Sequence, residues 1–135
     1  MTFSFEIITP EKIVFQDEVN EVIVPTTTGE VSILPNHATL LSQIAPGELI
    51  IKKDNKEHSL AITGGFLDVN NNKVHILADY AVRSEDIEIA KAQEAHKRAE
   101  KAMQEKGTDQ DFAMAEAQFR RAILELKVAH KRKRI

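Results

Sequence analysis

The most informative absences in this sequence of 135 residues are those of cysteine, of tryptophan and of any long apolar run. Without cysteine the chain can form neither a disulfide bond nor a thiolate metal site, and a reducing compartment suits it. No apolar run approaches the roughly 18–20 residues that a membrane-spanning helix needs. Residues 1–6 lack a basic stretch followed by an apolar core, so we expect no secretion signal. With 42% hydrophobic and 29% charged residues, the chain is typical of a soluble globular protein.

No known arrangement of catalytic residues accompanies this composition. The five histidines show no metal-ligand spacing, and His58 and His75 fall in expected strands, as surface or satisfied polar residues. A phosphate-binding loop, a nucleophile elbow and a dinucleotide-binding glycine pattern are all missing. For Gly64 and Gly65, a bulge or a tight corner is a simpler explanation than phosphate binding. We therefore expect a protein that is not an enzyme and that has no bound metal and no required cofactor.

The character of the chain changes abruptly near Ser84. Before it, short apolar stretches alternate with polar residues and are broken by glycine, proline and asparagine, a period that predicts strands. Such stretches occupy 3–7, 13–18, 22–24, 31–34, 49–51, 59–63, 66–69 and 73–78. The tracts 53–56 and 70–72 predict hairpin turns, because asparagine tolerates the left-handed conformation. Eight to ten short strands in some eighty residues predict a β-sandwich or a flattened barrel.

The remainder of the chain predicts an antiparallel pair of helices. It contains no proline and one glycine, and it carries dense mixed charge. Ser84 is the expected N-cap of the first helix, which should run to about Lys106 with Gly107 as its C-cap. Thr108 should cap the second helix, with Asp111 completing a variant of the capping box. The connection is so short that the helices must fold back on each other, which gives an α+β protein with two segregated modules.

The apolar positions of the two helices predict the face between them. On the second helix, large and small residues alternate at steps of three and four: Phe112, Ala115, Phe119, Ala122, Leu126 and Ala129. On the first, alanines keep the same rhythm: Ala92, Ala95, Ala99 and Ala102. Such a seam lets helices approach closely, but a buried methyl contributes only about 0.8 kcal/mol, against about 1.5–3 for a buried Leu or Phe. We expect a weakly cohesive hairpin that can open or change partners; a plain structural hairpin is the alternative.

Charge is distributed unevenly between the two expected modules. Residues 1–83 hold 11 acidic and 6 basic side chains, a balance of −5, whereas 84–135 hold 10 acidic and 12 basic, a balance of +2. From Arg120 onward there are seven basic residues and one acid, Glu125. On charge alone, this basic end could bind nucleic acid, anionic lipid or an acidic protein surface. The alternative is a solvent-exposed helix end, where cations interact favourably with the helix dipole.

Three stretches of the sequence carry a resemblance to a known family. They are GEVSILPNHATLL at 29–41, ITGGFLDV at 62–69 and AVRSEDI at 81–87. In order and spacing they resemble the epsilon subunit of bacterial and chloroplast F-type ATP synthases, which corresponds to the mitochondrial delta subunit. The resemblance covers essentially the whole chain and implies a non-catalytic subunit of the central stalk.

The resemblance also implies partners and a location. In that family the sandwich binds the gamma subunit and rests on the rotor c-ring, and the hairpin can extend along gamma toward the catalytic alpha and beta subunits and inhibit ATP hydrolysis. We expect a subunit of a proton-translocating complex at the cytoplasmic face of a bacterial plasma membrane, or at the stromal face of a thylakoid. It would be held at the membrane only through the complex and would have no nucleic-acid partner. The alternative is a module that binds nucleic acid or an anionic surface through the basic C-terminus, although no aromatic residue lies among the basic residues from Arg120 onward.

Contact residues follow from the resemblance. Glu30 and the loop of Pro35, Asn36 and His37 become candidates for the rotor-ring and gamma contact, with a purely structural turn as the alternative for the loop. Basic residues of the second helix become candidates for an acidic segment of the beta subunit: Arg120, Arg121, Lys127, Lys131 and Arg132, with Lys133 and Arg134 beyond. Exposed charge pairs are individually weak and screened by salt, which suits a reversible brake.

Some family members bind ATP on the folded hairpin through an Ile/Leu-Asp-x-x-Arg-Ala motif. The candidate residues at matching positions are Glu85, Ile87, Glu88, Lys91, Ala92, Arg98 and Arg121. Glu88 replaces the aspartate and Lys91 the arginine, while Glu125 lies where another arginine would help. Because lysine does not reproduce the planar fork of arginine, we expect at most weak binding of ATP as a regulatory ligand.

Overall fold

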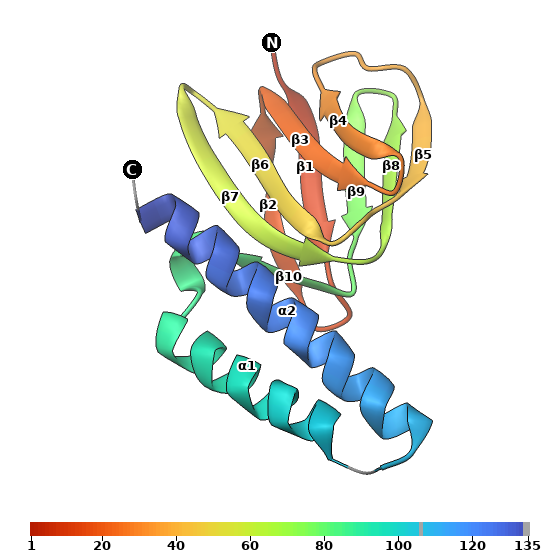
Figure 1. Ribbon diagram of the computed structural model, residues 1–135. Helices are drawn as coiled ribbons and strands as arrows, with labels where there is room; N and C mark the ends of the chain where they lie inside the picture. Colours follow the sequence, from red (N-terminus) through yellow and green to blue (C-terminus); the bar gives the residue numbers. More distant parts are fainter. Residues whose placement is uncertain (106, 134–135) are drawn as a thin grey trace. The chain divides into compact units, whose positions relative to one another are not determined.

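The computed structural model describes residues 1–105 and 107–133, and the chain divides into two compact units, Met1–Arg83 and Ser84–Ile135. The first unit contains ten strands in two five-stranded sheets (Figure 1). The second contains a short 3-10 helix and two α-helices. The expected β-sandwich followed by a two-helix hairpin is confirmed.

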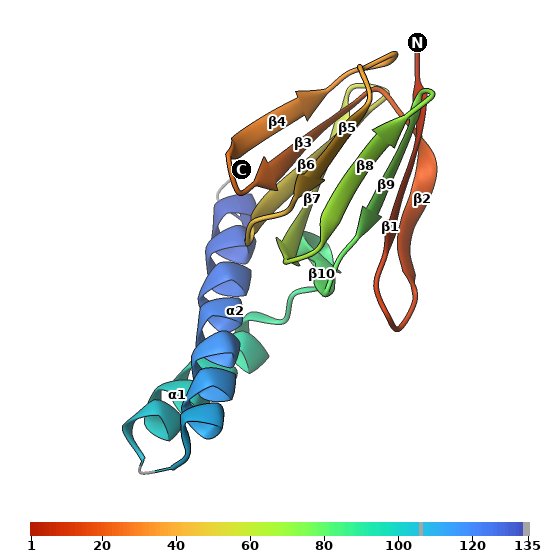
Figure 2. The ribbon, with the colours of Figure 1, turned by 90° about the vertical axis from the view of Figure 1, so that its right-hand side faces the viewer.

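The two sheets of the first unit form two layers (Figure 2). One sheet has the strand order β2-β1-β9-β8-β5 and the other β10-β7-β6-β3-β4. All neighbouring strands are antiparallel except β1 and β9, which are parallel. The strands are β1 Phe3–Ile8, β2 Ile13–Val19, β3 Glu21–Thr26, β4 Gly29–Ile33, β5 Leu40–Gln43, β6 Gly47–Lys53, β7 Lys56–Thr63, β8 Phe66–Asn70, β9 Lys73–Leu77 and β10 Tyr80–Arg83.

The core of the sandwich lies between the sheets, where the alternating pattern of each strand directs its apolar residues. Both sheets contribute its largest fully buried side chains, among them Phe3, Phe5, Leu49, Ile51, Leu67 and Ile76. Each such side chain stabilises the fold by about 1.5–3 kcal/mol through burial. The first unit therefore has a core of its own.

The sequence located the hairpin turns correctly but ended one strand too early. Asp54, Asn55, Asn71 and Asn72 all have positive φ, as tight turns between β6 and β7 and between β8 and β9 require. The third strand, expected at 22–24, continues through Pro25 to Thr26. Pro25 lacks an N–H, but its carbonyl oxygen still accepts a hydrogen bond from the Ala45 amide at 3.0 Å. This bond allows strand β3 to continue through the proline.

The first helix begins later than the sequence suggests. Ser84 starts the 3-10 helix η1 (Ser84–Asp86) and is not an N-cap; helix α1 spans Ile89–Gln104 after an extended Glu88. A single helix through this region would direct Ile87 and Ile89 about 200° apart, whereas the break at Glu88 allows Ile87 to be buried. The C-cap is Glu105, so the expectation for Gly107 is wrong, and Lys106 lies outside the described residues.

Helix α2 spans Asp109–Lys133 and packs antiparallel to α1, and its start is as predicted (Figure 1). The Asp111 amide donates to Thr108 Oγ1 at 3.0 Å, and the Thr108 amide donates to Asp111 Oδ2 at 3.2 Å, which completes the capping box. Within the described part of the chain, no helix combines the length and the apolar character needed to cross a membrane.

The alanine seam between the helices is largely as predicted. Ala92, Ala99, Ala115, Ala122 and Ala129 are buried, whereas Ala102 and Phe112 are exposed. The ring of Phe119 lies 4.5 Å from that of His96 on the facing helix, measured between centroids. The buried residues of this seam are mostly alanines, each of which contributes little burial energy.

Candidate functional site

The outer face of the first sheet carries a line of apolar side chains, which we call the apolar row. Strand register aligns them across four strands in the order Ile13, Ile8, Leu77 and Phe66. More than half of the surface of Ile13, Leu77 and Phe66 is exposed, and Leu41 on the neighbouring β5 is 74% exposed. A contiguous group of exposed apolar side chains on a soluble domain is typical of a protein-binding surface.

A polar row runs beside the apolar row on the same face. Glu6 of β1 lies between Gln16 of β2 and His75 of β9, and Asp68 of β8 lies on the far side of His75. His75 Nδ1 is 2.6 Å from Glu6 Oε1, and Gln16 Nε2 donates to Glu6 Oε2 at 3.4 Å. His75 is thus a satisfied surface residue, as expected, and it limits the apolar row on one side.

The sequence candidates for the rotor-ring contact do not lie together. Glu30 pairs with Pro25 beside the turn that joins β3 to β4, whereas the loop of Pro35, Asn36 and His37 follows the opposite end of β4. Within the loop, Asn36 is exposed and has a φ of 63°, while Pro35 and His37 are half-buried. The loop and Glu30 are therefore separate features of the sandwich.

The loop is tied to the rest of the sandwich by Asn72, which the sequence placed in a hairpin turn without indicating this contact. Asn72 Oδ1 accepts a hydrogen bond from the Asn36 amide at 2.8 Å. Asn72 Nδ2 donates to the Thr2 carbonyl oxygen at 3.1 Å, and the Asn72 carbonyl accepts from the Ser4 amide at 3.3 Å. One asparagine in the β8–β9 turn thus joins the loop to the N-terminal segment.

The candidate cations of α2 that the structure describes are partly paired within the helix. Arg120 Nη2 lies 2.6 Å from Glu116 Oε1, and Arg121 Nε lies 3.6 Å from Glu125 Oε1. Lys127 is exposed. The side chains of Lys131, Arg132 and Lys133, and the whole of Arg134, fall outside the described residues. Because an i,i+4 pair open to solvent is weak, Arg120 can exchange its pair with Glu116 for an acidic partner at small cost.

The candidate ATP residues of the hairpin are also engaged by carboxylates. Each of the three cations pairs with a glutamate three or four residues away: Lys91 with Glu88 at 3.3 Å, Arg98 with Glu94 at 3.5 Å and Arg121 with Glu125 at 3.6 Å. Ile87 and Ala92 are buried, and Glu85 lies in η1. The sequence pointed to the acid at Glu125 but not to the pairs made by Glu88 and Glu94. Each carboxylate at such a position repels phosphate oxygens.

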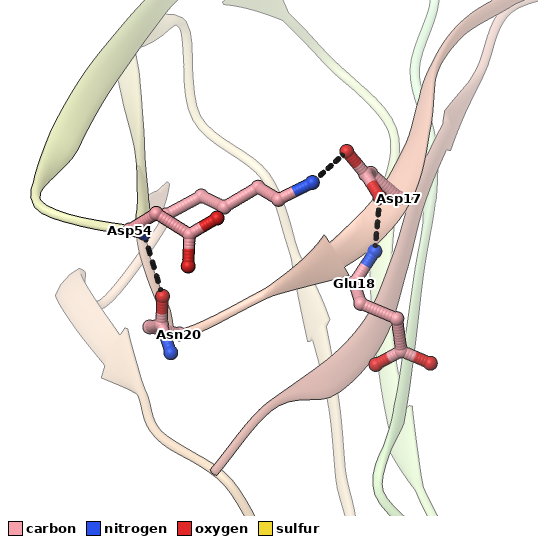
Figure 3. A network of polar contacts seen from close by, with 5 residues as sticks. Asp17, Glu18, Asn20 and Asp54 are labelled. Atoms are coloured by element: carbon pink, nitrogen blue, oxygen red, sulfur yellow. Dashed lines mark hydrogen bonds and ion pairs between the residues drawn. The ribbon is translucent and has the colours of Figure 1, made fainter.

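The sandwich also holds a small polar network between β2 and the β6–β7 turn (Figure 3). The hydrogen bond from Lys53 lowers the pKa of Asp17, and the bond from the Glu18 amide, at 2.8 Å, lowers it further. The same contact with Asp17 raises the pKa of Lys53. Nearby, Asn20 Oδ1 accepts from the Asp54 amide at 2.9 Å. This pairing joins residues distant in the chain and leaves no local sequence pattern.

The described residues contain no group of three or more His, Asp or Glu side chains that could hold a metal ion. Together, the ten-stranded sandwich, its exposed apolar face and the helical hairpin define a two-unit β-sandwich protein with surfaces suited to binding partners.

Known proteins share both units. Residues 2–84 match the beta-sandwich domain of the ATP synthase delta/epsilon chain, and residues 85–130 match its long alpha-helix domain. The chain belongs to the ATP synthase delta/epsilon chain family. The resemblance that the sequence suggested is therefore confirmed.

Similar curated proteins include the ATP synthase epsilon chain of Dehalococcoides mccartyi, 46% identical over 130 residues that cover 96% of this chain and 93% of that one. The ATP synthase epsilon chain of Herpetosiphon aurantiacus is 41% identical over 133 residues, 98% of each chain. Among solved structures, a chain of the Euglena gracilis mitochondrial ATP synthase (OSCP/F1/c-ring) has a TM-score of 0.76 at 25% identity, over 96% of this chain and 81% of that one. A chain of the Tetrahymena thermophila mitochondrial ATP synthase central stalk/c-ring structure has a TM-score of 0.65 at 16% identity. The match covers 93% of this chain and 95% of that one, and it shows a shared fold alone.

Proposed function

We propose that this chain is the non-catalytic epsilon-type subunit of the central stalk of a proton-translocating F-type ATP synthase. The sandwich binds the gamma subunit and contacts the rotor c-ring, and the hairpin regulates ATP hydrolysis. The subunit is held through the complex at the cytoplasmic face of a bacterial membrane, or at the stromal face of a thylakoid. Its relatives at 41–46% identity are ATP synthase epsilon chains, which supports this assignment.

The apolar row is the observation that carries the proposal. Ile13, Leu77 and Phe66 are exposed although each is large and apolar, and they extend across neighbouring strands as one surface. Burying such a surface against another protein stabilises a complex by about 25 cal/mol for each Å² of apolar area removed from water. We assign the gamma subunit to this face and the loop of Pro35, Asn36 and His37, with Glu30 as a separate point, to the rotor-ring contact.

Capture of an alpha-beta-gamma core complex that lacks this subunit tests the proposal. Wild-type chain should bind the core stably, and Phe66→Ala should weaken binding by about fivefold or more, because truncating an aromatic anchor of an interface can cost over 1 kcal/mol. Ser4→Ala on the same face, beyond the polar row from Phe66, is the control and should bind like wild type. Absence of wild-type binding would refute the stalk assignment.

The weak seam of the hairpin supports its regulatory role. Its helices meet mainly through alanines, so the free energy that holds them together is small and a competing surface can replace it. We assign Arg120, Arg121, Lys127, Lys131 and Arg132 to the contact with the catalytic beta subunit. In the assembled complex, replacing both Arg120 and Arg121 by glutamine should raise ATP hydrolysis several-fold.

Two comparisons make that experiment decisive. Removing residues 84–135 should raise hydrolysis at least as much as the double substitution does. Lys97→Gln, which removes an exposed cation from α1, should leave hydrolysis unchanged. Unchanged hydrolysis and an unchanged salt response in the double variant would contradict the proposed brake.

ATP binding to the hairpin is weak in this proposal. A nucleotide must displace the pairs made by Lys91, Arg98 and Arg121, and it meets their glutamates as repelling neighbours. Titration of the chain with ATP, followed through hairpin amide NMR signals, should give shifts that saturate only in the millimolar range. Flat signals at these concentrations would remove the site.

A further inference from the structure

The Gly64-Gly65-Phe66 stretch borders a cleft on the sandwich. The cleft has a volume of about 510 Å³. Its walls include Ile8, Pro10, Phe66 and Leu77, and Gln43 and Asp79 are among its polar lining residues. Three of the wall residues, Ile8, Phe66 and Leu77, belong to the apolar row, so the cleft is a hollow in that surface.

Among the described residues that line the cleft, Asp79 is the single charged one. It is exposed, and no hydrogen bond or ion pair joins it to another residue in the described part of the chain. An exposed carboxylate of this kind beside apolar walls is complementary to a cation that approaches along those walls.

Gly64 explains why this carboxylate lies where it does. A Cβ atom at Gly64 would lie 2.2 Å from Asp79 Oδ2, so the carboxyl group occupies the space that any other residue would fill. The next residue, Gly65, is packed as closely against the backbone, since its Cβ would lie 1.9 Å from the Leu77 carbonyl oxygen. The missing side chain at Gly64 thus leaves room for the Asp79 carboxyl group at the corner between β7 and β8, beside the cleft.

We propose that this cleft receives an arginine or lysine side chain of the stalk subunit that docks on the apolar row. The inference rests on the proposed function and names one contact within it. The methylene groups of the incoming side chain pack on Phe66 and Leu77, and its charged end binds the Asp79 carboxylate. Arginine suits the site best, because its planar group pairs with a carboxylate in a bidentate manner and also stacks on an aromatic ring such as Phe66.

Affinity for the alpha-beta-gamma core, measured at two salt concentrations, tests this contact. Asp79→Asn keeps the shape of the side chain and removes its charge, so it should weaken binding about fivefold to tenfold and reduce the salt dependence of the affinity. Asp79→Lys, which reverses the charge, should weaken binding further. Asp68→Asn removes a carboxylate from the same face outside the cleft and is the matched control, with less than a twofold effect.

The outcomes separate this contact from the function on which it rests. Binding of Asp79→Asn with wild-type affinity and salt dependence, while Phe66→Ala binds weakly, would overturn the cation contact and leave the stalk assignment intact. Equal losses in Asp79→Asn and Asp68→Asn would also overturn it, since they would reflect the overall charge of the face. Hydrogen exchange of the buried strand amides verifies that each variant is folded, and a wild-type chain that fails to bind would refute the proposed function itself.

Discussion

Replacing Gly65 by alanine is the substitution that most directly tests the packing of the sandwich corner. Gly65 has a φ of 109°, a conformation that residues with a side chain rarely adopt. The added Cβ would lie 1.9 Å from the Leu77 carbonyl oxygen and 2.8 Å from the Ala78 Cα. Both are backbone atoms, so neither can rotate away. The following amide, that of Ala78, donates to the Ile8 carbonyl at 2.9 Å, so any shift also strains the link between β1 and β9.

The cost of this substitution can be built from two terms. Holding an alanine at such a φ costs about 1–3 kcal/mol. Displacing the backbone at Leu77 and loosening the Ala78 hydrogen bond adds about 1–2 kcal/mol. The sum of about 2–5 kcal/mol is a large share of the stability of a domain, which is typically about 5–15 kcal/mol.

Gly29 provides a matched control for Gly65→Ala. Gly29 also has a positive φ, 120°, but an added Cβ there meets no atom within 4 Å. Gly29→Ala should therefore show only the conformational term, about 1–3 kcal/mol. Native-state hydrogen exchange of the most protected strand amides reports the unfolding free energy of the sandwich separately from that of the hairpin. Equal losses in the two variants would refute the steric argument.

Three further predictions concern the polar network around Asp17, the N-terminal cap of α2 and the hydrogen bond between Asn72 and the Asn36 amide. Because the folded-state pKa of Asp17 is lowered, its stabilising effect is complete above the ordinary aspartate pKa and is lost as pH falls through the lowered value. The raised pKa of Lys53 acts in the opposite direction: its contribution is complete below the ordinary lysine pKa and is lost as pH rises through the raised value. Lys53→Met should therefore remove this contribution from the alkaline limb of a stability–pH profile and reduce the acid limb, where the Glu18 amide still lowers the pKa of Asp17. Thr108→Ala should destabilise α2 by about 1 kcal/mol, measured by amide exchange in its first turns. Asn72→Gly keeps the positive φ but removes the bond to the Asn36 amide, whose exchange should accelerate about fivefold to tenfold.

Each of these predictions has a control that separates its cause from general damage. Lys56→Met removes another lysine at the end of the β6–β7 turn and should leave the pH profile intact. Thr108→Ser retains the capping oxygen, and a loss equal to that of Thr108→Ala would contradict the cap. Asn72→Asp retains the acceptor oxygen for the Asn36 amide. If that amide exchanged as fast in Asn72→Asp as in Asn72→Gly, the role of this hydrogen bond would be contradicted.

The local features of both units could be predicted because they are encoded over a few neighbouring residues. The period of two before Ser84 and the capping box of Thr108 and Asp111 needed only nearby sequence. The start of the first helix was missed for a local reason as well: Ser84 is a good cap by type, but the burial of Ile87 favoured a break before Ile89. Here tertiary packing prevailed over local preference.

The surfaces proposed for function depend on pairings between residues distant in sequence. The apolar row joins Ile13 to Phe66 through two intervening strands, and the parallel pairing of β1 with β9 that aligns it leaves no local pattern. The hydrogen bond between Asn72 and the Asn36 amide joins residues 36 positions apart, and the Asp79 carboxyl group lies beside Gly64 although a chain reversal separates them. Contact residues inferred from resemblance, such as Glu30 and His37, proved to lie at opposite ends of β4.

By itself, the sequence determined that the chain is a β-sandwich followed by a helical pair, and to which family it belongs, because periodicity, turn residues and short motifs are properties of contiguous residues. The tertiary structure decided which exposed side chains form one surface and which carboxylate lines a cleft. Strand order and register set those neighbours, and both are chosen by burial of the whole core, to which residues from every strand contribute.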